Sequence, residues 1–510
     1  MTRKQVGSSI VESLGYLMDG FAVAFTGRNL LLCFVGCLWG TAVGVLPGLG
    51  PLAGMALLLP LTFKLDPAGA VIMLAGIFNG AMYGGSTTSI LMRIPGEAAS
   101  VVTCIDGYEM AKRGRAGAAL TIAAVGSFVG GTVSIVGLMA VGPLLADAML
   151  TVGPAAEFVL MLTALLVVSA VSSSPPVKTL AMIVLGLALG TVGLDQLTAW
   201  PRFTFGSLDL TDGINFVALS IGLFGVSEIL LNLDEAAPQV PRAPRLREML
   251  PTRQEIREAA PAVLRGSGVG FLFGLVPGVS HIISTFVAYA IEKKVSKTPE
   301  KFGHGAVAGV AGPETANNAT TGASMIPLLV LGIPAIPATA ILLSALLIHG
   351  VQPGPLLMSE HPQVFWGLIA SLYLGNAILV VLNLPLIGIF VSLLRTPMGV
   401  LAPLVLVICL IGVYSLKGSP LDLAILVGAG VVGYVLRKFS YDVAPLLLAF
   451  VLGDRMELSF RRALTISDGD YLVFVQGPAA RVFLAVLVLI GGLQLAAMLL
   501  GWRRRGAAAP

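Results

Sequence analysis

The chain has 510 residues, of which 56% are hydrophobic and only 11% are charged, and its formal net charge is +4. Its mean hydropathy is +0.92, whereas a soluble protein has roughly 45–50% apolar and about 25% charged residues. These values exclude an ordinary soluble protein and predict a polytopic membrane protein. The small positive charge lies in loops, so no basic face is left for nucleic acid.

Residues 1–28 precede the first long apolar segment. Within them, Ile10, Leu14, Leu17, Met18 and Phe21 recur on one face of a helix. Such a pattern is typical of a helix that lies in the membrane interface. We therefore expect an N-terminal interfacial helix rather than a first membrane crossing.

Residues 29–233 form a predicted first transmembrane repeat. Its opening apolar segment, from Leu30 to Val45, is interrupted by Leu46-Pro-Gly-Leu-Gly-Pro51 and resumes to Phe63. Neither arm reaches the roughly 20 residues of a straight spanning helix, so a broken or re-entrant hairpin is predicted. The next segment runs into a polar stretch, Asn79 to Gly96, and further apolar segments follow to Leu231.

Residues 234–265 are rich in Pro, Arg and Glu and are predicted to be a cytoplasmic linker. A second transmembrane repeat is expected over residues 266–460. A C-terminal transmembrane helix and a basic tail are expected over residues 461–510. The tail contains Arg503, Arg504 and Arg505, which indicate a cytoplasmic end because basic residues are retained on that side of the membrane.

The two repeats are related by sequence. The stretch from Asn318 to Ala335 aligns with the first polar stretch without a gap, and it matches Asn79 to Asn318 and Ile94-Pro95 to Ile333-Pro334. Upstream of each, Gly44-Val-Leu-Pro-Gly-Leu-Gly50 aligns with Gly274-Leu-Val-Pro-Gly-Val-Ser280. Because the order of both motifs is kept in each half, the chain is a diverged duplication.

Loops at equivalent positions of the two repeats carry opposite charge patterns. Lys112, Arg113 and Arg115 follow the first polar stretch, whereas the loop 350–363 after the second contains no Lys or Arg. The loops after the two hairpins show the reverse pattern, with one lysine in the first and four in the second. Basic loops are cytoplasmic, so the repeats are expected to be inverted, a common plan of secondary transporters. The predicted fold class is an all-α polytopic membrane protein of about 12 transmembrane segments, with broken or re-entrant helices and two inverted-topology repeats.

The polar stretches carry the chemistry of an anion site and a cation site. In Tyr83-Gly-Gly-Ser-Thr-Thr88 the glycines let the backbone leave helical geometry, and the amides that open the next half-helix then suit a carboxylate. Asparagine carbonyls in the second half suit Na⁺. The candidate substrate-binding residues are Pro47, Gly48, Leu49, Gly50, Ser86, Thr87, Thr88, Gly278, Val279, Ser280, His281, Thr320 and Thr321. The candidates for the coupling ion are Asn79, Glu314, Asn317 and Asn318, and those for helix breaks are Pro95, Gly96, Pro277, Pro334 and Pro337.

Each of these features also has a structural explanation. Small residues allow close helix packing, and Pro-Gly pairs can simply kink a helix. Arg93 and Glu97 could pair with each other, which we favour, or Arg93 could meet an anionic substrate. Glu314 could bind a proton or a cation, or cap a helix. His281 is either a packed side chain or a group that binds substrate or a proton. The occurrence of the motifs in two matched pairs favours function.

Several motifs together resemble the large membrane subunit of the tripartite tricarboxylate transporters. The resemblance spans about Gly20 to Leu500. It is carried by Gly44-Val-Leu-Pro-Gly-Leu-Gly-Pro51, Tyr83-Gly-Gly-Ser86, Ile94-Pro-Gly96, Asp106-Gly-Tyr108, Lys112-Arg-Gly-Arg-Ala-Gly117, Pro313-Glu-Thr-Ala-Asn-Asn318 and Leu347-Ile-His-Gly-Val-Gln-Pro-Gly-Pro355.

The resemblance implies a multi-pass permease of the bacterial inner membrane. It further implies two partners, a small membrane subunit and a periplasmic solute-binding protein, a di- or tricarboxylate substrate such as citrate, and symport with Na⁺ or H⁺. No organic cofactor and no metal beyond Na⁺ are implied. Two departures from the family pattern, Val279-Ser280-His281 and Gly332-Ile-Pro-Ala335, leave the identity of the carboxylate open.

Other function classes fit less well. A passive anion channel would use similar pore-lining residues, and a carrier for another organic acid, such as an aromatic carboxylate, stays an alternative. An enzyme is not expected, because the sequence contains no His-Glu-x-x-His and no Gly-x-Ser-x-Gly. A Walker-type loop is also absent, so ATP use is not encoded in this chain. Elevator-like and rocking movements are both compatible with the sequence.

Overall fold

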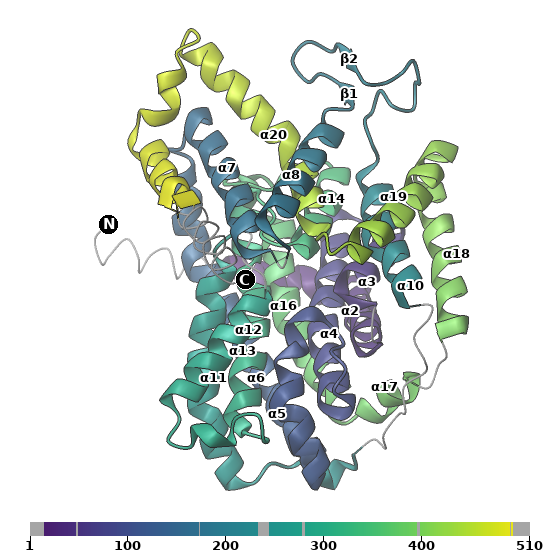
Figure 1. Cartoon of the computed structure of the whole chain (residues 1–510), viewed down its shortest axis with the longest axis vertical. Coiled ribbons are helices and arrows are strands. Elements are labelled where there is room, and N and C mark those ends of the chain that lie inside the picture. The colour runs from purple at the N-terminus through teal and green to yellow at the C-terminus, as the bar shows by residue number, and fades with distance from the viewer. Residues whose placement is uncertain are drawn as a thin grey trace, which may run out of the picture. The chain divides into compact units, whose positions relative to one another are not determined.

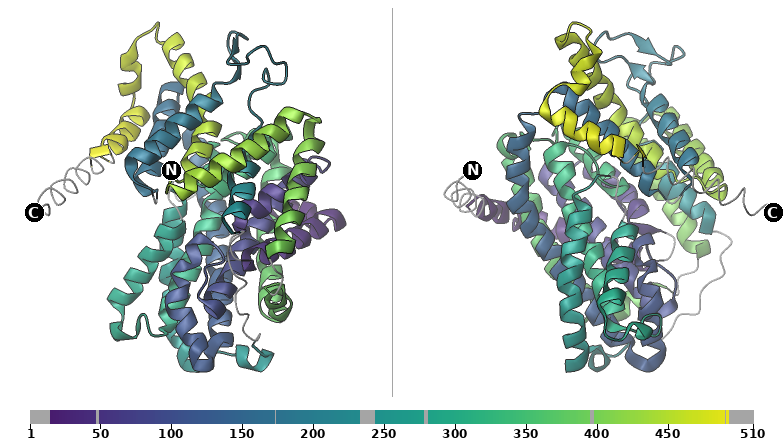
Figure 2. Two further views of the ribbon diagram at one scale, coloured as in Figure 1. Left: turned by 45° about the vertical axis from the view of Figure 1, so that its right-hand side comes forward. Right: turned by 60° about the vertical axis from the view of Figure 1, so that its left-hand side comes forward.

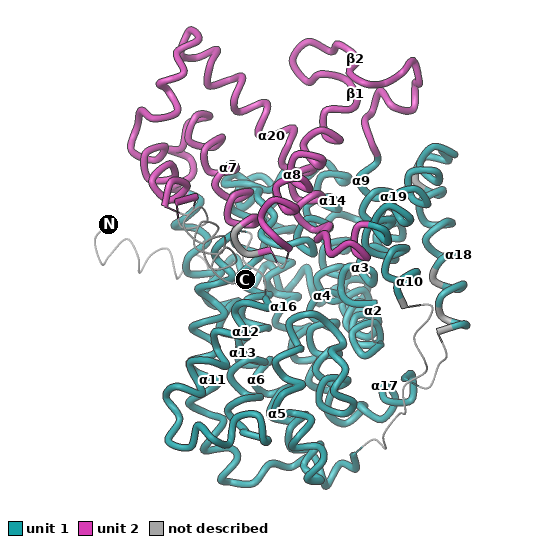
Figure 3. Tube along the Cα trace, viewed as in Figure 1, with its two compact units in different colours: residues 1–146, 215–435 teal, residues 147–214, 436–510 magenta. Residues whose placement is uncertain are grey.

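The computed structural model describes residues 15–46, 49–172, 174–232, 244–277, 281–394, 398–489 and 491–492. Within these ranges the chain is almost entirely helical and contains one short antiparallel pair of strands (Figure 1). The chain forms two compact units, one of residues 1–146 and 215–435 and the other of residues 147–214 and 436–510 (Figure 3). Each unit is therefore built from two separate stretches of sequence.

The first unit contains most of the helices. Those before residue 233 are α2 (Gly27–Val45), α3 (Gly50–Thr62), α4 (Pro67–Met92), η1 (Ala98–Val101), α5 (Thr103–Met110), η2 (Ala111–Arg115), α6 (Ala116–Met149), α9 (Phe216–Ser220), η3 (Ile221–Val226) and α10 (Ser227–Asn232). The later ones are η4 (Leu246–Met249), α11 (Arg253–Gly274), α12 (His281–Val295), η5 (Pro299–Lys301), α13 (Val307–Ala323), η6 (Pro327–Leu331), α14 (Pro337–Ile348), α15 (Leu357–Glu360), α16 (Pro362–Asn383), α17 (Ile387–Leu393), α18 (Met398–Lys417) and α19 (Pro420–Lys438).

Five helical stretches in the described part of the chain are long and apolar enough to cross a membrane. They are Gly27–Val45, Pro67–Met92, Thr103–Met149, Pro362–Asn383 and Pro420–Lys438. Shorter apolar helices accompany them, among them α3 and α14. The break between α2 and α3 falls within the predicted interruption of the first hairpin. The expected number of about 12 crossings stays a prediction, since a straight spanning helix needs roughly 20 residues and several of the apolar helices are shorter than that.

The stretch 234–265, whose role as a cytoplasmic linker stays a prediction, is partly helical. Helix α11 begins at Arg253, inside the stretch expected to connect the repeats. The reason is a capping box, in which the Thr252 hydroxyl accepts from the Glu255 N–H at 3.2 Å and the Glu255 carboxylate accepts from the Thr252 N–H at 2.6 Å. The predicted N-terminal interfacial helix falls partly on residues 1–14, which lie outside the described residues.

Glycines let two pairs of helices pack with their backbones almost in contact. Successive positions along α2 meet successive positions along α4, so the two helices run in parallel. A Cβ atom at Gly40 would lie 2.2 Å from the carbonyl oxygen of Ile77, and one at Gly44 would lie 2.3 Å from that of Ala81. Helices α11 and α13 pack in the same way, since a Cβ atom at Gly270 would lie 2.3 Å from the carbonyl oxygen of Ala316. Small residues on both surfaces are what such close approach requires.

Helices α4 and α13 form the buried centre of the first unit. Of the residues of α13, all but Ala308 are buried, and 94% of the most apolar window of α4 is buried. Apolar clusters around Ile90 and Tyr83 surround them with side chains of α6, α11, α16 and α17. The polar side chains of both helices are therefore enclosed by protein rather than by lipid.

The prediction that the backbone leaves helical geometry at Gly84 and Gly85 is wrong. Helix α4 continues without interruption to Met92 and ends at Arg93, whose φ is 59°. Gly84 and Gly85 instead provide space, because Cβ atoms there would lie 2.4 Å from the Thr41 carbonyl oxygen and 2.6 Å from the Glu97 side chain. The break follows at Ile94 to Gly96, which includes the predicted positions Pro95 and Gly96.

The breaks in the second half lie at comparable places. The chain is non-helical from Gly332 to Ile336, which includes Pro334, and Pro337 opens α14. Pro277 lies in the turn after α11. Because α13 continues to Ala323, Asn317 to Thr321 are helical residues, and they offer side chains rather than free backbone amides.

Asp106 joins two distant segments of the first unit. Its Oδ1 atom accepts hydrogen bonds from the N–H groups of Gly303, Gly305 and Ala306 at 2.7–2.9 Å, and its Oδ2 atom accepts from the Tyr289 hydroxyl at 2.9 Å. The carboxylate thus satisfies the N–H groups that precede α13, where a helix leaves its first amides without partners.

Asp106→Ala is expected to destabilise the protein by about 3 kcal/mol, because each unpaired buried N–H costs about 1–3 kcal/mol. Thermal unfolding of the purified protein in detergent measures the loss. Asp106→Asn is the control, since its side-chain carbonyl still accepts from these amides and the loss should be smaller. Equal stability of Asp106→Ala and the wild type would contradict this role for the carboxylate.

The second unit is a helical bundle with one loop that contains the strands. It consists of α7 (Pro154–Val171), α8 (Pro176–Gly190), β1 (Gly193–Leu194), β2 (Pro201–Arg202), α20 (Ala444–Ile466), η7 (Tyr471–Val475) and a helical stretch at Pro478–Leu489. Helix α20 packs against both α7 and α8 (Figure 2). A Cβ atom at Gly186 would lie 2.1 Å from the Leu446 carbonyl oxygen, and one at Gly190 would lie 3.2 Å from that of Phe450. Helices α8 and α20 therefore run in parallel.

Candidate functional site

Glu314 connects the two polar stretches. It lies on α13 and is 1% exposed. Its Oε2 atom accepts a hydrogen bond from the Ser86 hydroxyl of α4 at 2.5 Å, and its Oε1 atom accepts from the Thr103 hydroxyl of α5. A carboxylate from the second half of the chain is thus held by two hydroxyls from the first half. Predicted site residues Ser86 and Glu314 are in direct contact.

A second buried carboxylate lies beside the first. Glu97 is 8% exposed and precedes η1. Its Oε1 atom accepts from the Asn317 side-chain amide at 2.9 Å, and its Oε2 atom accepts from the N–H of Ala99 at 2.7 Å. Here a carboxylate from the first half contacts an amide from the second half, so the contacts between the halves are reciprocal.

The favoured pairing of Arg93 with Glu97 is wrong. Arg93 is exposed, and its guanidinium lies 5.8 Å from the centre of the Tyr108 ring. The reason is the left-handed backbone of Arg93, which turns this residue away from the buried side while Glu97 turns inward to cap η1. Within the described residues, no Lys or Arg side chain forms an ion pair with Glu97 or Glu314.

Two amide oxygens in this cluster are buried without a hydrogen-bond partner in the described part of the protein, namely Oδ1 of Asn317 and Oδ1 of Asn318. The Nδ2 atom of Asn318 donates to the Ser127 hydroxyl at 2.6 Å, which directs the oxygen the other way. Buried polar atoms nearly always have partners. Amide oxygens suit a cation, or a proton donor such as a protonated carboxyl group.

His281 opens α12 and lies beside α13. Its Nε2 atom is 3.1 Å from the Thr321 hydroxyl, and its ring meets that of Phe78 edge-on at 5.9 Å between centres. The Thr321 hydroxyl also donates to the Asn317 carbonyl at 3.0 Å. His281 therefore belongs to the cluster, although packing against Phe78 also accounts for its place.

The other predicted residues make no described hydrogen bond to Glu97 or Glu314. Thr88 donates to the Val45 carbonyl at 3.2 Å, Thr320 donates to the Gly270 carbonyl at 3.1 Å, and the Asn79 amide donates to Ala75 of its own helix at 3.0 Å. Thr87 is buried on α4, and Leu49 and Gly50 lie at the start of α3. Pro47, Gly48, Gly278, Val279 and Ser280 lie outside the described residues.

Sequence reasoning missed several members of the cluster. Glu97 was considered only as a partner of Arg93, and Thr103 and Ser127 were not singled out. Asn376 makes a separate buried polar contact that the sequence also did not reveal: its side-chain oxygen accepts from the Tyr83 hydroxyl at 2.5 Å, and its amide donates to the Phe128 carbonyl at 2.8 Å. Asn376 lies in the apolar helix α16. A polar residue in an apolar helix indicates a side chain that faces the protein interior, so Asn376 could have been singled out from the sequence.

Comparison with known proteins identifies the family. Residues 30–448 match the tripartite tricarboxylate transporter TctA family. The chain belongs to this family. As a TctA protein it is the large membrane subunit of a tripartite tricarboxylate transporter, a permease rather than an enzyme, and an integral membrane protein. This confirms the family expected from the motifs.

Two similar proteins come from Agrobacterium vitis. An uncharacterized 52.8 kDa protein in the TAR-I ttuC' 3' region is 47% identical over 477 residues, which is 94% of this chain and 95% of the relative. An uncharacterized protein in the TAR-II ttuC' 3' region is 48% identical over 211 residues, which is 41% of this chain and 87% of the relative. No solved structure matches this TctA chain.

Proposed function

We propose that this TctA protein imports a di- or tricarboxylate by symport with Na⁺ or H⁺. The observation that carries the proposal is the pair of buried carboxylates, Glu97 and Glu314, which come from different halves of the chain and have no basic partner among the described residues. An isolated buried charge is very costly. Binding of a cation or a proton at this pair removes much of that cost.

The same pair explains how uptake would be coupled to the ion. A carboxylate substrate that approaches Ser86, Thr87, Thr88, Thr320, Thr321 and His281 meets like charges on Glu97 and Glu314. In a medium of low dielectric constant this repulsion is strong. The substrate therefore binds well only after the cation has neutralised the pair. Asn317 and Asn318, with their unpartnered oxygens, are the further ligands of the cation.

The surroundings of the pair fit an anionic substrate. Helix α12 begins at His281, beside Thr321 of α13, and the first amides of a helix attract negative charge. The matched motifs and the opposite charge patterns of the loops support two inverted repeats of a secondary transporter. In that arrangement the protein lies in a bacterial inner membrane and acts with a small membrane subunit and a periplasmic solute-binding protein, as family membership implies.

The test is uptake of radiolabelled di- and tricarboxylates into proteoliposomes that contain the chain, its small subunit and its solute-binding protein. Na⁺ and proton gradients are imposed separately. Accumulation against the substrate gradient, driven by one of the two ions, is expected. Replacement of Ser86, Thr87 and Thr88 by bulky residues should abolish it, because these positions are buried among packed helices.

The alternatives give other results in the same experiment. Equilibration without accumulation under either gradient would favour a passive anion channel and contradict symport. Accumulation of an aromatic carboxylate, but not of di- or tricarboxylates, would favour a carrier for a different organic acid. A suitable control is a conservative change of a buried hydroxyl outside the cluster, such as Ser344→Ala in α14, whose hydroxyl donates to the Ala340 carbonyl of its own helix at 3.0 Å.

A further inference from the structure

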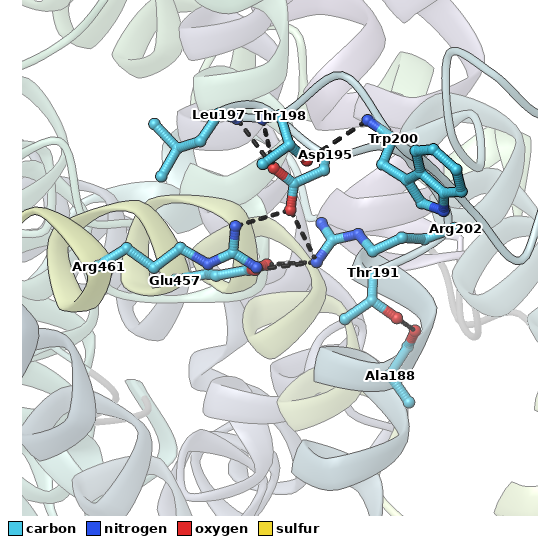
Figure 4. Close-up of polar contacts among 9 residues, drawn as sticks. All are labelled: Ala188, Thr191, Asp195, Leu197, Thr198, Trp200, Arg202, Glu457 and Arg461. Atoms are coloured by element: carbon cyan, nitrogen blue, oxygen red, sulfur yellow. Dashed lines mark hydrogen bonds and ion pairs between the residues drawn. The ribbon is translucent and has the colours of Figure 1, made fainter.

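Four charged side chains fix the 193–213 loop of the second unit on helix α20. The Oδ2 atom of Asp195 accepts from Arg461 at 2.7 Å and lies 3.5 Å from Nη1 of Arg202. Glu457 accepts from Arg202 at 2.9 Å and pairs with Arg461 at 2.5 Å (Figure 4). The network therefore alternates in charge, and it holds Asp195, which follows β1, and Arg202 of β2 to Glu457 and Arg461, one turn apart on α20.

Asp195 also organises the loop itself. Its Oδ1 atom accepts from the N–H groups of Thr198 at 2.8 Å and of Leu197 at 3.0 Å. The hydrogen bond from the Thr198 N–H is the main reason that the pKa of Asp195 lies well below its usual range. The carboxylate thus stays charged at physiological pH, and the network persists. The Trp200 ring points away from these ion pairs (Figure 4).

The loop lies beyond the apolar part of the second unit. The end of α8 at Gly190 is level with Phe450 of α20, whereas the loop contacts Glu457 and Arg461 further along that helix. The extension of α20 past Phe450 carries several charged residues, which are costly in the hydrocarbon of a bilayer. These residues are Asp454, Arg455, Glu457, Arg461 and Arg462. The loop is therefore expected in water or at the level of the lipid head groups.

The connection of the 193–213 loop to the linker indicates on which side of the membrane the loop lies. One continuous helical segment, Phe216 to Asn232, leads from the loop to the Arg-rich linker. Basic connections of this kind remain in the cytoplasm. A single crossing from there places the 193–213 loop on the opposite, extracytoplasmic side, the side from which an imported carboxylate arrives.

The loop exposes large apolar side chains on a fixed backbone. Trp200 is 73% exposed, Phe205 is 88% exposed and Leu208 is 86% exposed. Phe203 and Phe205 have φ values of 51° and 48°, a conformation that bulky residues rarely adopt. Such strain is kept where a particular shape is needed, and a preformed shape favours recognition because less freedom is lost on binding.

Charge distinguishes a protein partner from a lipid surface. Two charged side chains of the loop are exposed, Asp209 and Asp212, and both are acidic, whereas Arg202 is held in the network. Anionic lipids attract basic segments, so this loop suits them poorly. An apolar centre of aromatic residues with a charged rim is typical of a protein interface.

We propose that the 193–213 loop is the docking surface for the soluble solute-binding protein that delivers the carboxylate, and that the partner's contact face carries an apolar pocket with a basic rim. This inference rests on the proposed function, which supplies the partner. The fixed backbone presents Phe205 and Leu208 as the anchors, and Asp209 beside them pairs with the basic rim.

Photo-crosslinking tests the surface without any measurement of transport. The four native cysteines are buried, so Leu208→Cys can be labelled alone with a benzophenone maleimide in the full-length chain in lipid nanodiscs. The probe is the solute-binding protein of the same system. We expect a crosslinking yield at least about tenfold above that of Leu250→Cys, because a probe near the centre of an interface lies against the partner, whereas a probe at position 250 lies on the other side of the membrane. Leu250 is a matched control, since it is 73% exposed and lies in the predicted cytoplasmic linker, on the other side of the membrane.

Other products would overturn the proposal. Equal yields at the two positions would show that Leu208 is not at the interface. Crosslinks between two copies of the chain would assign the loop to self-association. An environment-sensitive dye at Leu208→Cys that reports apolar surroundings before the binding protein is added would assign the loop to the lipid.

A second measurement separates this proposal from the proposed function. Phe205→Ser with Leu208→Ser should raise the concentration of binding protein that gives half-maximal uptake by about tenfold and leave maximal uptake unchanged. These side chains are exposed, so the core is not altered. Crosslinking by a chain that transports nothing would contradict the proposed function alone. Normal half-saturation in the double variant would contradict the docking surface alone.

Discussion

Glu314→Ala is expected to reduce gradient-driven uptake of the carboxylate by at least about a hundredfold. The change removes one of two buried carboxylates and leaves the hydroxyls of Ser86 and Thr103 without their acceptor. Hydrogen bonds to a charged group contribute about 1.5–3 kcal/mol each, and 1.4 kcal/mol corresponds to about tenfold. Uptake into proteoliposomes under imposed Na⁺ or proton gradients measures the effect.

Glu314→Gln separates coupling from packing. Glutamine keeps the size of the side chain and one acceptor oxygen, but it carries no charge and binds no proton. This variant should still bind substrate and should lose its response to the driving ion. Asp422→Asn is the matched control: Asp422 is another buried acid, accepts from the Asn215 amide at 2.6 Å and lies at the start of α19. Gradient-driven accumulation by Glu314→Ala would show that coupling lies elsewhere.

That the two polar stretches meet could be predicted from the sequence, because the motifs occur in matched pairs. A polar stretch in an apolar segment is costly unless protein encloses it, so two aligned stretches indicated a shared centre. The structure brings Ser86 into contact with Glu314, and Asn317 into contact with Glu97, whereas a role of these residues in transport stays a prediction.

The role of the glycines could not be predicted in the same way. In a membrane helix a glycine either interrupts the helix or lets another helix approach, and the residue type is the same in both cases. At Gly84 the second role applies, because the backbone of α2 lies against it. The consequence is that the Ser86 hydroxyl of α4, rather than a free amide, contacts Glu314.

Contacts between residues far apart in sequence could not be predicted either. The contact of Glu97 with Asn317 joins residues from different halves of the chain, and no local pattern encodes it. Arg93, four residues away, looked like the natural partner because such spacing brings side chains together on a helix. That rule failed because the helix ends at Arg93, and its left-handed backbone separates the two side chains.

Close helix packing gives the second large expected effect. Gly270→Ala in α11 should destabilise the protein by about 1–3 kcal/mol, the cost of overpacking a well-packed contact. Its Cβ atom would lie 2.3 Å from the Ala316 carbonyl oxygen of α13, and a backbone atom cannot move aside as a flexible side chain can. Because α13 carries Glu314 and Asn317, displacement of this helix should also lower uptake.

Gly268→Ala is the matched control, two residues away on the same helix. A Cβ atom there meets nothing within 4 Å, and alanine in a helix interior is favoured over glycine by roughly 0.5–1 kcal/mol. The two variants should therefore shift thermal unfolding in opposite directions, down for Gly270→Ala and up for Gly268→Ala. Equal shifts would mean that helix propensity alone determines the effect and that α11 and α13 do not pack with their backbones in contact. Opposite shifts, with uptake lost only in Gly270→Ala, would tie the glycines to the position of the carboxylate pair.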